Sequence, residues 1–296
     1  MMNNLPSISV ALTTFNGGKY IEVQLASILN QSFAPTEVVI CDDSSTDNTM
    51  EILEQWAKLY SVIKIYSSDK QLGVNMNFNK AISQCKGDYI ALSDQDDIWE
   101  LNKLENQLQD IQTLELLKGK SFPILSVHDL TMITADGIVI AQSAWKHNAG
   151  SPIVPKSSLL FTNNYNGCTM LFNKPLKNLV LPIPEKVPMH DHWIALTAFY
   201  LGRILTSETS LLNYRRHDNT VTKHKNNRLK RYLHNIFGKN YKQNEINQCK
   251  EFLSRHQKSL NPKAVRQIKS VIDLTNSINL VRKIHFSFKY RFTRLI

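Results

Sequence analysis

Short apolar runs alternate with amphipathic segments through the first 120 residues of the chain. Between the runs, apolar residues recur at helical spacing near residues 21–30, 52–59, 75–85 and 100–117. This alternation predicts βαβ units that form a parallel sheet with helices on its faces. The runs that predict buried strands are Ile8–Leu12, Glu37–Cys41, Ile63–Tyr66 and Tyr89–Leu92.

The pattern changes after residue 120. Strand-like segments lie at 125–128, 133–140 (with an Asp136-Gly137 turn), 168–172 and 211–214, and an apolar helix begins at His190–Trp193 and runs to about Leu201. We therefore expect an α/β domain over residues 1–222, with its two parts at about 6–120 and 121–222.

Charge divides the chain in the same place. Residues 223–296 carry 18 Lys plus Arg and 3 Asp plus Glu, a net charge of +15, whereas residues 1–222 have a net charge of −5. The tail is helical in composition, and its segment His285–Ile296 sets four aromatic residues among cations. Such a segment suits the surface of an anionic membrane. The alternative is a set of helices that pack on the first domain and present a solvated basic face.

Other features of the composition exclude several classes of protein. No apolar run is long enough to span a bilayer, and the N-terminus lacks the features of a signal peptide, so we expect a cytoplasmic protein. The four cysteines are scattered without CxxC spacing, which favours reduced thiols. Nucleic acid is an unfavourable partner, since the first domain is acidic and carries no nucleic-acid motif.

Three of the predicted strands end in polar or acidic loops: Thr13-Thr14, Asp42-Asp43 and Ser93–Asp97. In open α/β sheets, ligands bind beyond the carboxyl ends of the strands. Asp94 and Asp96, one residue apart directly after a strand, can face one hard cation such as Mg²⁺ or Mn²⁺. The alternative for this pair is a solvated acidic turn.

Several motifs in this order resemble the family 2 inverting glycosyltransferases, which have the GT-A fold. In the nucleotide-binding half the matching stretches are Val10–Gly17, Ser27–Ser32, Val38–Asp47, Leu72–Val74 with Asn77, and Lys86–Asp97. The stretches Gly167–Asn173, His190–Trp193 and Tyr214–His217 look like the rhamnosyltransferase-type branch. The resemblance covers about residues 6–222 and leaves out the basic tail.

The resemblance implies roles for matching positions on the donor side. Thr13 and Phe15 would line the nucleobase pocket with Asn16 beside them, although the family often has Tyr at position 15. Asp42 or Asp43 would accept hydrogen bonds from the base or ribose, unless Asp42 only caps a helix end. Nearer the sugar and diphosphate, Asn77 and Asp94 would contact the ribose and sugar, and Asp96 would be the principal metal ligand.

The resemblance also implies roles on the acceptor side. Asp191 would be the general base, with Trp193 packing against the acceptor; the alternative is that Asp191 only caps its helix. Arg216 would clamp the diphosphate and His217 would reach the metal, whereas the alternative for this segment, above all for Arg215, is a basic surface loop. Cys168 is expected in a buried wall of the acceptor site.

The function that these roles imply is inverting transfer of rhamnose or another hexose from a dTDP- or UDP-sugar to a saccharide acceptor. Such an enzyme would act in bacterial surface polysaccharide or glycolipid synthesis, on an acceptor carried by a lipid at the inner face of the membrane. A nucleotidyltransferase would have a Gly- and Lys-rich phosphate loop after the first strand, which Thr13–Gly18 is not. A non-catalytic protein of the same fold is the other alternative.

Overall fold

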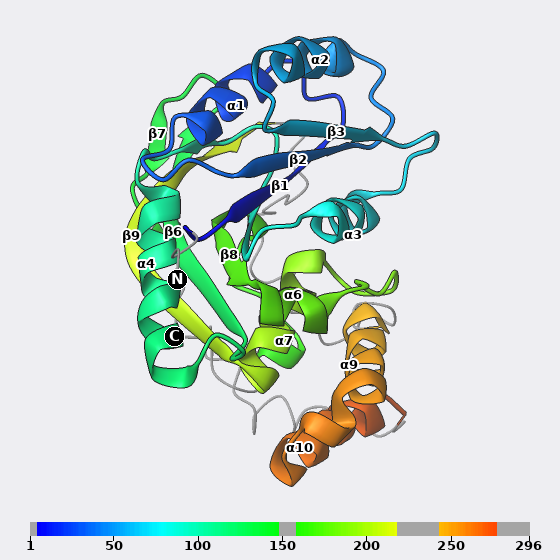
Figure 1. Cartoon of the computed structure of the whole chain (residues 1–296). Helices are drawn as coiled ribbons and strands as arrows, with labels where there is room; N and C mark the ends of the chain where they lie inside the picture. Colours follow the sequence, from blue (N-terminus) through cyan, green and yellow to red (C-terminus); the bar gives the residue numbers. More distant parts are fainter. Residues whose placement is uncertain (1–4, 148–157, 218–242, 277–296) are drawn as a thin grey trace.

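The computed structural model describes residues 5–147, 158–217 and 243–276. Their strands form one curled sheet of mixed direction, flanked by helices (Figure 1), in the order β3-β2-β1-β4-β8-β6-β9-β5 with β7 paired to β6. The strands are β1 (Ile8–Thr14), β2 (Glu37–Asp42), β3 (Ile63–Ser67), β4 (Tyr89–Ser93), β5 (Ile98–Trp99), β6 (Ile124–Thr134), β7 (Val139–Ala141), β8 (Met170–Asn173) and β9 (Arg203–Arg216).

The first half of the sheet is wholly parallel, as the alternation of strands and helices predicts. Strand β1 lies between β2 and β4, and β2 pairs with β3. Strands β1, β2 and β4 are buried on both faces because helices cover each side, whereas the edge strand β3 is partly exposed. The helices α1 (Ile21–Leu29) and α2 (Thr49–Leu59) share a core with Val10 and Leu12 on one face, and α3 (Val74–Gln84) shares a second core with Ala11 on the other.

The second half of the sheet departs from the parallel pattern. Strand β8 is antiparallel to both β4 and β6, whereas β6 and β9 run parallel. The predicted strands at 125–128 and 211–214 are parts of much longer strands, and the turn at Gly137, with φ of 86°, joins β6 to β7. The remaining helices of this part are α4 (Lys103–Lys118), α5 (Ala144–His147), α6 (Lys174–Val180) and α7 (His190–Leu201), with short 3-10 turns at Ser158–Leu160 and Gly167–Thr169.

Two helices from the basic tail pack beneath this domain: α9 (Gln243–His256) and α10 (Pro262–Asn276), joined by a 3-10 turn at Gln257–Ser259. Helix α9 buries Cys249 and Phe252 in the core that also contains Trp193 of α7. The described part of the tail is therefore a packed extension of the fold. The aromatic and cationic segment His285–Ile296 lies outside the described residues, and no helix among the described residues is long and apolar enough to cross a membrane.

Candidate active site

The carboxyl ends of β1, β2 and β4 meet at one edge of the sheet. The register pairs Thr14 with Asp42 and Leu12 with Ser93, so the loops that follow these strands are neighbours. These loops carry most of the residues that the sequence singles out. The fold thus brings together polar groups separated by up to 80 positions along the chain, as in the bond from the Phe15 N–H to Gln95.

Asp42 and Asp43 are buried and hold neighbouring loops in place. Asp42 accepts hydrogen bonds from the Thr14 hydroxyl and the Ser45 N–H, both at 2.8 Å. It therefore stabilises a turn at the strand end and caps no helix. Asp43 accepts the N–H groups of Leu72 and Gly73 at 2.6 and 2.9 Å. The two carboxylates fix the loop before α3 next to the end of β2.

The loop after β1 is shaped by a residue that the motif analysis did not single out, Gln95. Its side-chain amide pairs with the backbone of Phe15, accepting from the N–H at 2.8 Å and donating to the carbonyl at 3.0 Å. Because both backbone groups of Phe15 are held, its ring is presented to solvent, 41% exposed. Thr13 is half-buried on the same strand. An exposed aromatic face on a fixed backbone suits stacking with a nucleobase.

Two asparagines complete the donor side. Asn16, with φ of 48°, donates its N–H to the Ser45 hydroxyl and accepts the Thr46 N–H through Oδ1, each at 2.8 Å. Asn77 on α3 donates Nδ2 to the Cys41 carbonyl at 2.9 Å, and its Oδ1 is buried without a hydrogen-bond partner among the described residues. Asn16 is thus a structural part of the loop, whereas Asn77 retains an unused acceptor.

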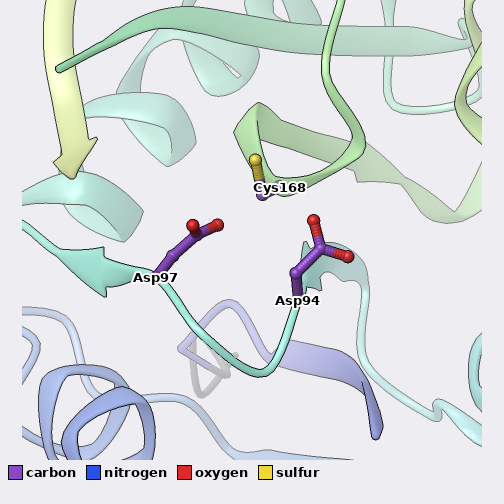
Figure 2. Close-up of side chains that lie close together, drawn as sticks. All are labelled: Asp94, Asp97 and Cys168. Carbon is purple, nitrogen blue, oxygen red and sulfur yellow. The ribbon is translucent and has the colours of Figure 1, made fainter. Parts of the chain in front are cut away.

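Three aspartates crowd the loop after β4, and burial with mutual repulsion raises the pKa of two of them. The pKa of Asp94 rises to about 7, because burial disfavours its charged form and the charges of Asp96 and Asp191 repel it. Burial, followed by the charges of Asp96 and Asp94, raises the pKa of Asp97 well above its ordinary value. Figure 2 shows the carboxylates of Asp94 and Asp97 and the thiol of Cys168 facing one another; the nearest ligand atoms of the three lie within 4.8 Å of each other.

A buried lysine lies behind this acidic loop. Lys103 at the start of α4 has no exposed surface; its Nζ donates to Gln107 at 2.9 Å and sits 4.1 Å from the centre of the Trp99 ring. Burial is the dominant cause and lowers its pKa to about 7. The sequence pattern does not indicate a role for Lys103, because a lysine in a helix is ordinarily exposed.

Asp96 is paired with a residue 121 positions away. His217, just after β9, places Nε2 2.7 Å from Asp96 Oδ2, and its ring lies 5.2 Å from that of Tyr20. The structure therefore places the predicted metal ligands Asp96 and His217 together, with Asp94 on the same loop.

Arg215 and Arg216 differ in their surroundings. Arg215 is buried; its Nε donates to the Asp96 carbonyl at 3.0 Å, its Nη1 donates to the Ala135 carbonyl at 2.7 Å, and its N–H donates to Asp97 at 3.2 Å. This excludes the exposed surface loop considered for Arg215. Arg216 is half-buried and adjoins Thr134 in the sheet register.

Asp191 lies in the first turn of α7 and is half-buried. Burial raises its pKa to about 6, against hydrogen bonds from the His192 N–H, the Asn163 side chain and the Gly167 N–H that stabilise the charged form. Its charge in turn raises the pKa of Asp94, so the two carboxylates lie near one another. A carboxyl with a pKa of about 6 is poised to take up a proton near neutral pH.

The residues around Asp191 are structural. Burial lowers the pKa of His190 to about 3 and that of His192 to about 4, so both are neutral at pH 7. The expectation that Trp193 packs against an acceptor is wrong: Trp193 has no exposed surface, donates Nε1 to the Val180 carbonyl at 2.8 Å and packs edge-on against Phe252 of α9. An aromatic residue in the first turn of a helix can point into the core or into the site. Trp193 points into the core because α9 packs against it.

The ligand types present fit a divalent cation. Asp96 and Asp94 offer carboxylate oxygens, the ligands that Mg²⁺ and Mn²⁺ prefer, and His217 adds an imidazole nitrogen. The short contact between Asp96 and His217 shows that two of these ligand atoms already lie together. Cys168 is 1% exposed and burial raises the pKa of its thiol well above the ordinary range, so the thiol is not a thiolate in this setting.

Residues 9–117 match the family model described as Glycosyl transferase family 2. The putative teichuronic acid biosynthesis glycosyltransferase TuaG of Bacillus subtilis is 38% identical over 109 residues, which cover 37% of this chain and 43% of TuaG. The dTDP-rhamnosyl transferase RfbG of Shigella flexneri is 41% identical over 102 residues, 33% of this chain and 35% of RfbG. The aligned stretch thus spans less than half the length of these relatives.

Among solved structures, S. aureus TarS 1-349 in complex with UDP-GlcNAc superimposes with a TM-score of 0.62 and 21% identity. The superposition covers 97% of this chain and 77% of that chain. A likeness at this level of identity shows a shared fold. The sequence match is confined to residues 9–117, which are similar to glycosyl transferase family 2.

Proposed function

We propose that the chain is an inverting glycosyltransferase that moves a sugar from a nucleotide-diphosphate donor to a saccharide acceptor. One observation carries the proposal: Asp191, from α7, lies close enough to Asp94 at the end of β4 for its charge to raise the pKa of Asp94, and Asp96 of the same loop pairs with His217. A proton acceptor and a set of cation ligands thereby lie at the sheet edge where this type of fold binds nucleotides.

Each side of the site has a task in the reaction. A bound Mg²⁺ or Mn²⁺ supplies Lewis acidity that stabilises the charge growing on the leaving diphosphate. Asp94, Asp96 and His217 would hold that cation. Asp191 takes the proton of the acceptor hydroxyl as the hydroxyl oxygen bonds to the anomeric carbon. The bond from that carbon to the phosphate oxygen breaks at the same time, its electron pair leaves with the nucleoside diphosphate, and the configuration inverts.

The donor side accommodates a pyrimidine nucleotide. Phe15 offers a ring for stacking, and Asn77 offers a buried hydrogen-bond acceptor. Asp42 and Asp43 hold the neighbouring loops in place. Uracil and thymine differ by one methyl group, so these contacts serve a UDP-sugar or a dTDP-sugar alike. Both chemistries occur in the names of similar proteins, UDP-GlcNAc with TarS and dTDP-rhamnose with RfbG. Arg216 remains a candidate for the diphosphate.

We further propose that residues 1–222 form the catalytic domain, with the donor half at about 6–120, and that residues 223–296 form an extension bearing a membrane-facing segment. The charge of the tail supports a lipid-linked acceptor at an anionic surface. Bacterial surface polysaccharide or glycolipid synthesis fits the name of TuaG, a putative teichuronic acid biosynthesis glycosyltransferase.

The test is binding of a panel of UDP-, dTDP- and GDP-sugars with and without Mn²⁺, to the wild type and to Asp96→Ala. Metal-dependent binding of one nucleotide class that Asp96→Ala abolishes supports the donor site, and loss of transfer with retained binding in Asp191→Asn supports catalysis. Binding of a nucleotide sugar without transfer to any acceptor would favour the non-catalytic alternative. Absence of binding to every nucleotide sugar would contradict the proposal.

A further inference from the structure

Helix α3 connects the nucleotide side of the site to the helix that carries Asp191. The N-terminal end of α3 is fixed to the strands by two side chains. Asp43 accepts the N–H groups of Leu72 and Gly73. Asn77 donates to the Cys41 carbonyl at 2.9 Å. Any residue of α3 is therefore held at a defined position relative to the ends of β1 and β2.

The face of α3 that points away from the strands contacts the start of α7. Asn75 accepts the His190 N–H through Oδ1 at 2.8 Å and donates Nδ2 to the Val187 carbonyl at 3.3 Å. One turn further on, the ring of Phe78 stacks on the ring of His190, with centroids 3.9 Å apart and planes inclined by 20°. The contacts lie immediately before Asp191.

The N-cap position of helix α7 is Met189, which makes no side-chain hydrogen bond, so the His190 N–H at the start of the helix depends on a partner from elsewhere. Asn75 supplies this partner from α3. A side-chain oxygen that satisfies a free N–H at a helix start fixes where the helix begins, and here the next residue after the capped N–H is Asp191.

We propose that Asn75 is a positioning residue that sets the Asp191 carboxylate against the donor site by capping α7 from α3. The inference rests on the proposed role of Asp191 as the base. Asn75 is itself one step removed from the reacting atoms, since its side chain is hydrogen-bonded to the backbone of residues 187 and 190. Its effect is on the placement of Asp191, and so on turnover, while the nucleotide contacts on the strands are unchanged.

The chain contains a matched control on the same helix. Asn79, one turn from Asn75, accepts the Ile183 N–H through Oδ1 at 2.7 Å. Both asparagines thus cap a backbone N–H of the segment 183–190, but the partner of Asn79 lies seven residues before His190, outside α7. Asn75→Ala and Asn79→Ala remove the same type of bond at two distances from Asp191.

The experiment compares steady-state kinetics and UDP or dTDP binding, whichever the wild type binds, for Asn75→Ala, Asn75→Asp and Asn79→Ala. Asn75→Ala should lower kcat by roughly 10- to 100-fold, as expected for a misplaced catalytic group, with the nucleotide Kd within about twofold of wild type. Asn75→Asp keeps the acceptor for the His190 N–H and should recover most of kcat. Asn79→Ala should leave kcat within about threefold of wild type.

Hydrogen exchange provides a second measurement on the same variants. The His190 amide should exchange faster in Asn75→Ala and at the wild-type rate in Asn79→Ala. Equal kcat for wild type and Asn75→Ala, or equal loss in the two alanine variants, would overturn the positioning role. Inactivity of the wild type itself would instead refute the proposed function, so the two failures are distinguishable.

Discussion

Replacing Asp191 with Asn should make the protein more stable at neutral pH while abolishing its activity. The residue is half-buried, and desolvation raises the pKa of its carboxyl from 3.8 to about 6. A raised pKa means that the folded protein binds this proton more tightly than the unfolded chain does. The ionised carboxylate therefore costs stability: the cost is absent below about pH 4, grows between about pH 4 and 6, and is constant above.

The size of the effect follows from the shift. About two pKa units at 1.36 kcal/mol each correspond to ~3 kcal/mol at pH 8, and roughly 1 kcal/mol has developed by about pH 4.5. Asn replaces a carboxylate that accepts N–H groups of Gly167 and His192. Imperfect reuse of these bonds offsets about 1 kcal/mol of the gain. We expect a net stabilisation of ~1–2 kcal/mol at pH 8, and none at about pH 4.5.

Urea unfolding of wild type and Asp191→Asn at about pH 4.5, 6 and 8 measures the difference. Asp136→Asn, at an exposed aspartate in the turn after β6, is the control and should show no such pH dependence. Asp191→Asn should also lose ~10²- to 10⁴-fold in kcat, because it lacks the general base. If the stability difference between Asp191→Asn and wild type is the same at all three pH values, the carboxylate is solvated and the reasoning fails.

Three further changes test other parts of the site and the fold. His217→Ala should raise the Mn²⁺ concentration needed for half-maximal nucleotide-sugar binding by ~10- to 100-fold, since it removes the partner of Asp96; an unchanged titration would exclude His217 from the cation site. Gly17→Ala places a methyl group where the amide of Gln95 lies, so nucleotide Kd should rise ~10-fold, and an unaltered Kd would show that the loop adapts. Phe252→Ala leaves a cavity between α9 and α7 and should cost ~3–5 kcal/mol in the free energy of unfolding. A cost below about 1 kcal/mol, measured in urea, would mean that α9 does not stabilise the domain.

The local sequence sufficed to predict the parallel half of the sheet. Each of its strands is predicted by a largely apolar run, and β1, β2 and β4 are buried because helices from the same stretch of chain cover both faces. The long strand β9 was predicted only at 211–214. Its first part, Arg203–Ser210, is polar and largely exposed and gains its strand conformation from pairing with β6, which no local pattern reports.

The candidate site shows the same division. The acidic loop after β4 was predictable because its residues are adjacent in sequence and follow a buried strand. The pairing of His217 with Asp96, the burial of Arg215 against Asp97 and the direction of Trp193 were decided by the tertiary structure. Each depends on which segments pack together across more than fifty residues.

The sequence by itself determined which chemical groups this protein has and which strand ends present them. Hydrophobic periodicity and loop composition are properties of neighbouring residues, so they can be read along the chain. Only the tertiary structure decided which of those groups face one another, and thus that Asp191 carries a pKa of about 6 and Asp94 one of about 7. Burial and charge proximity are properties of the packed molecule, and they arise only when distant segments exclude water together.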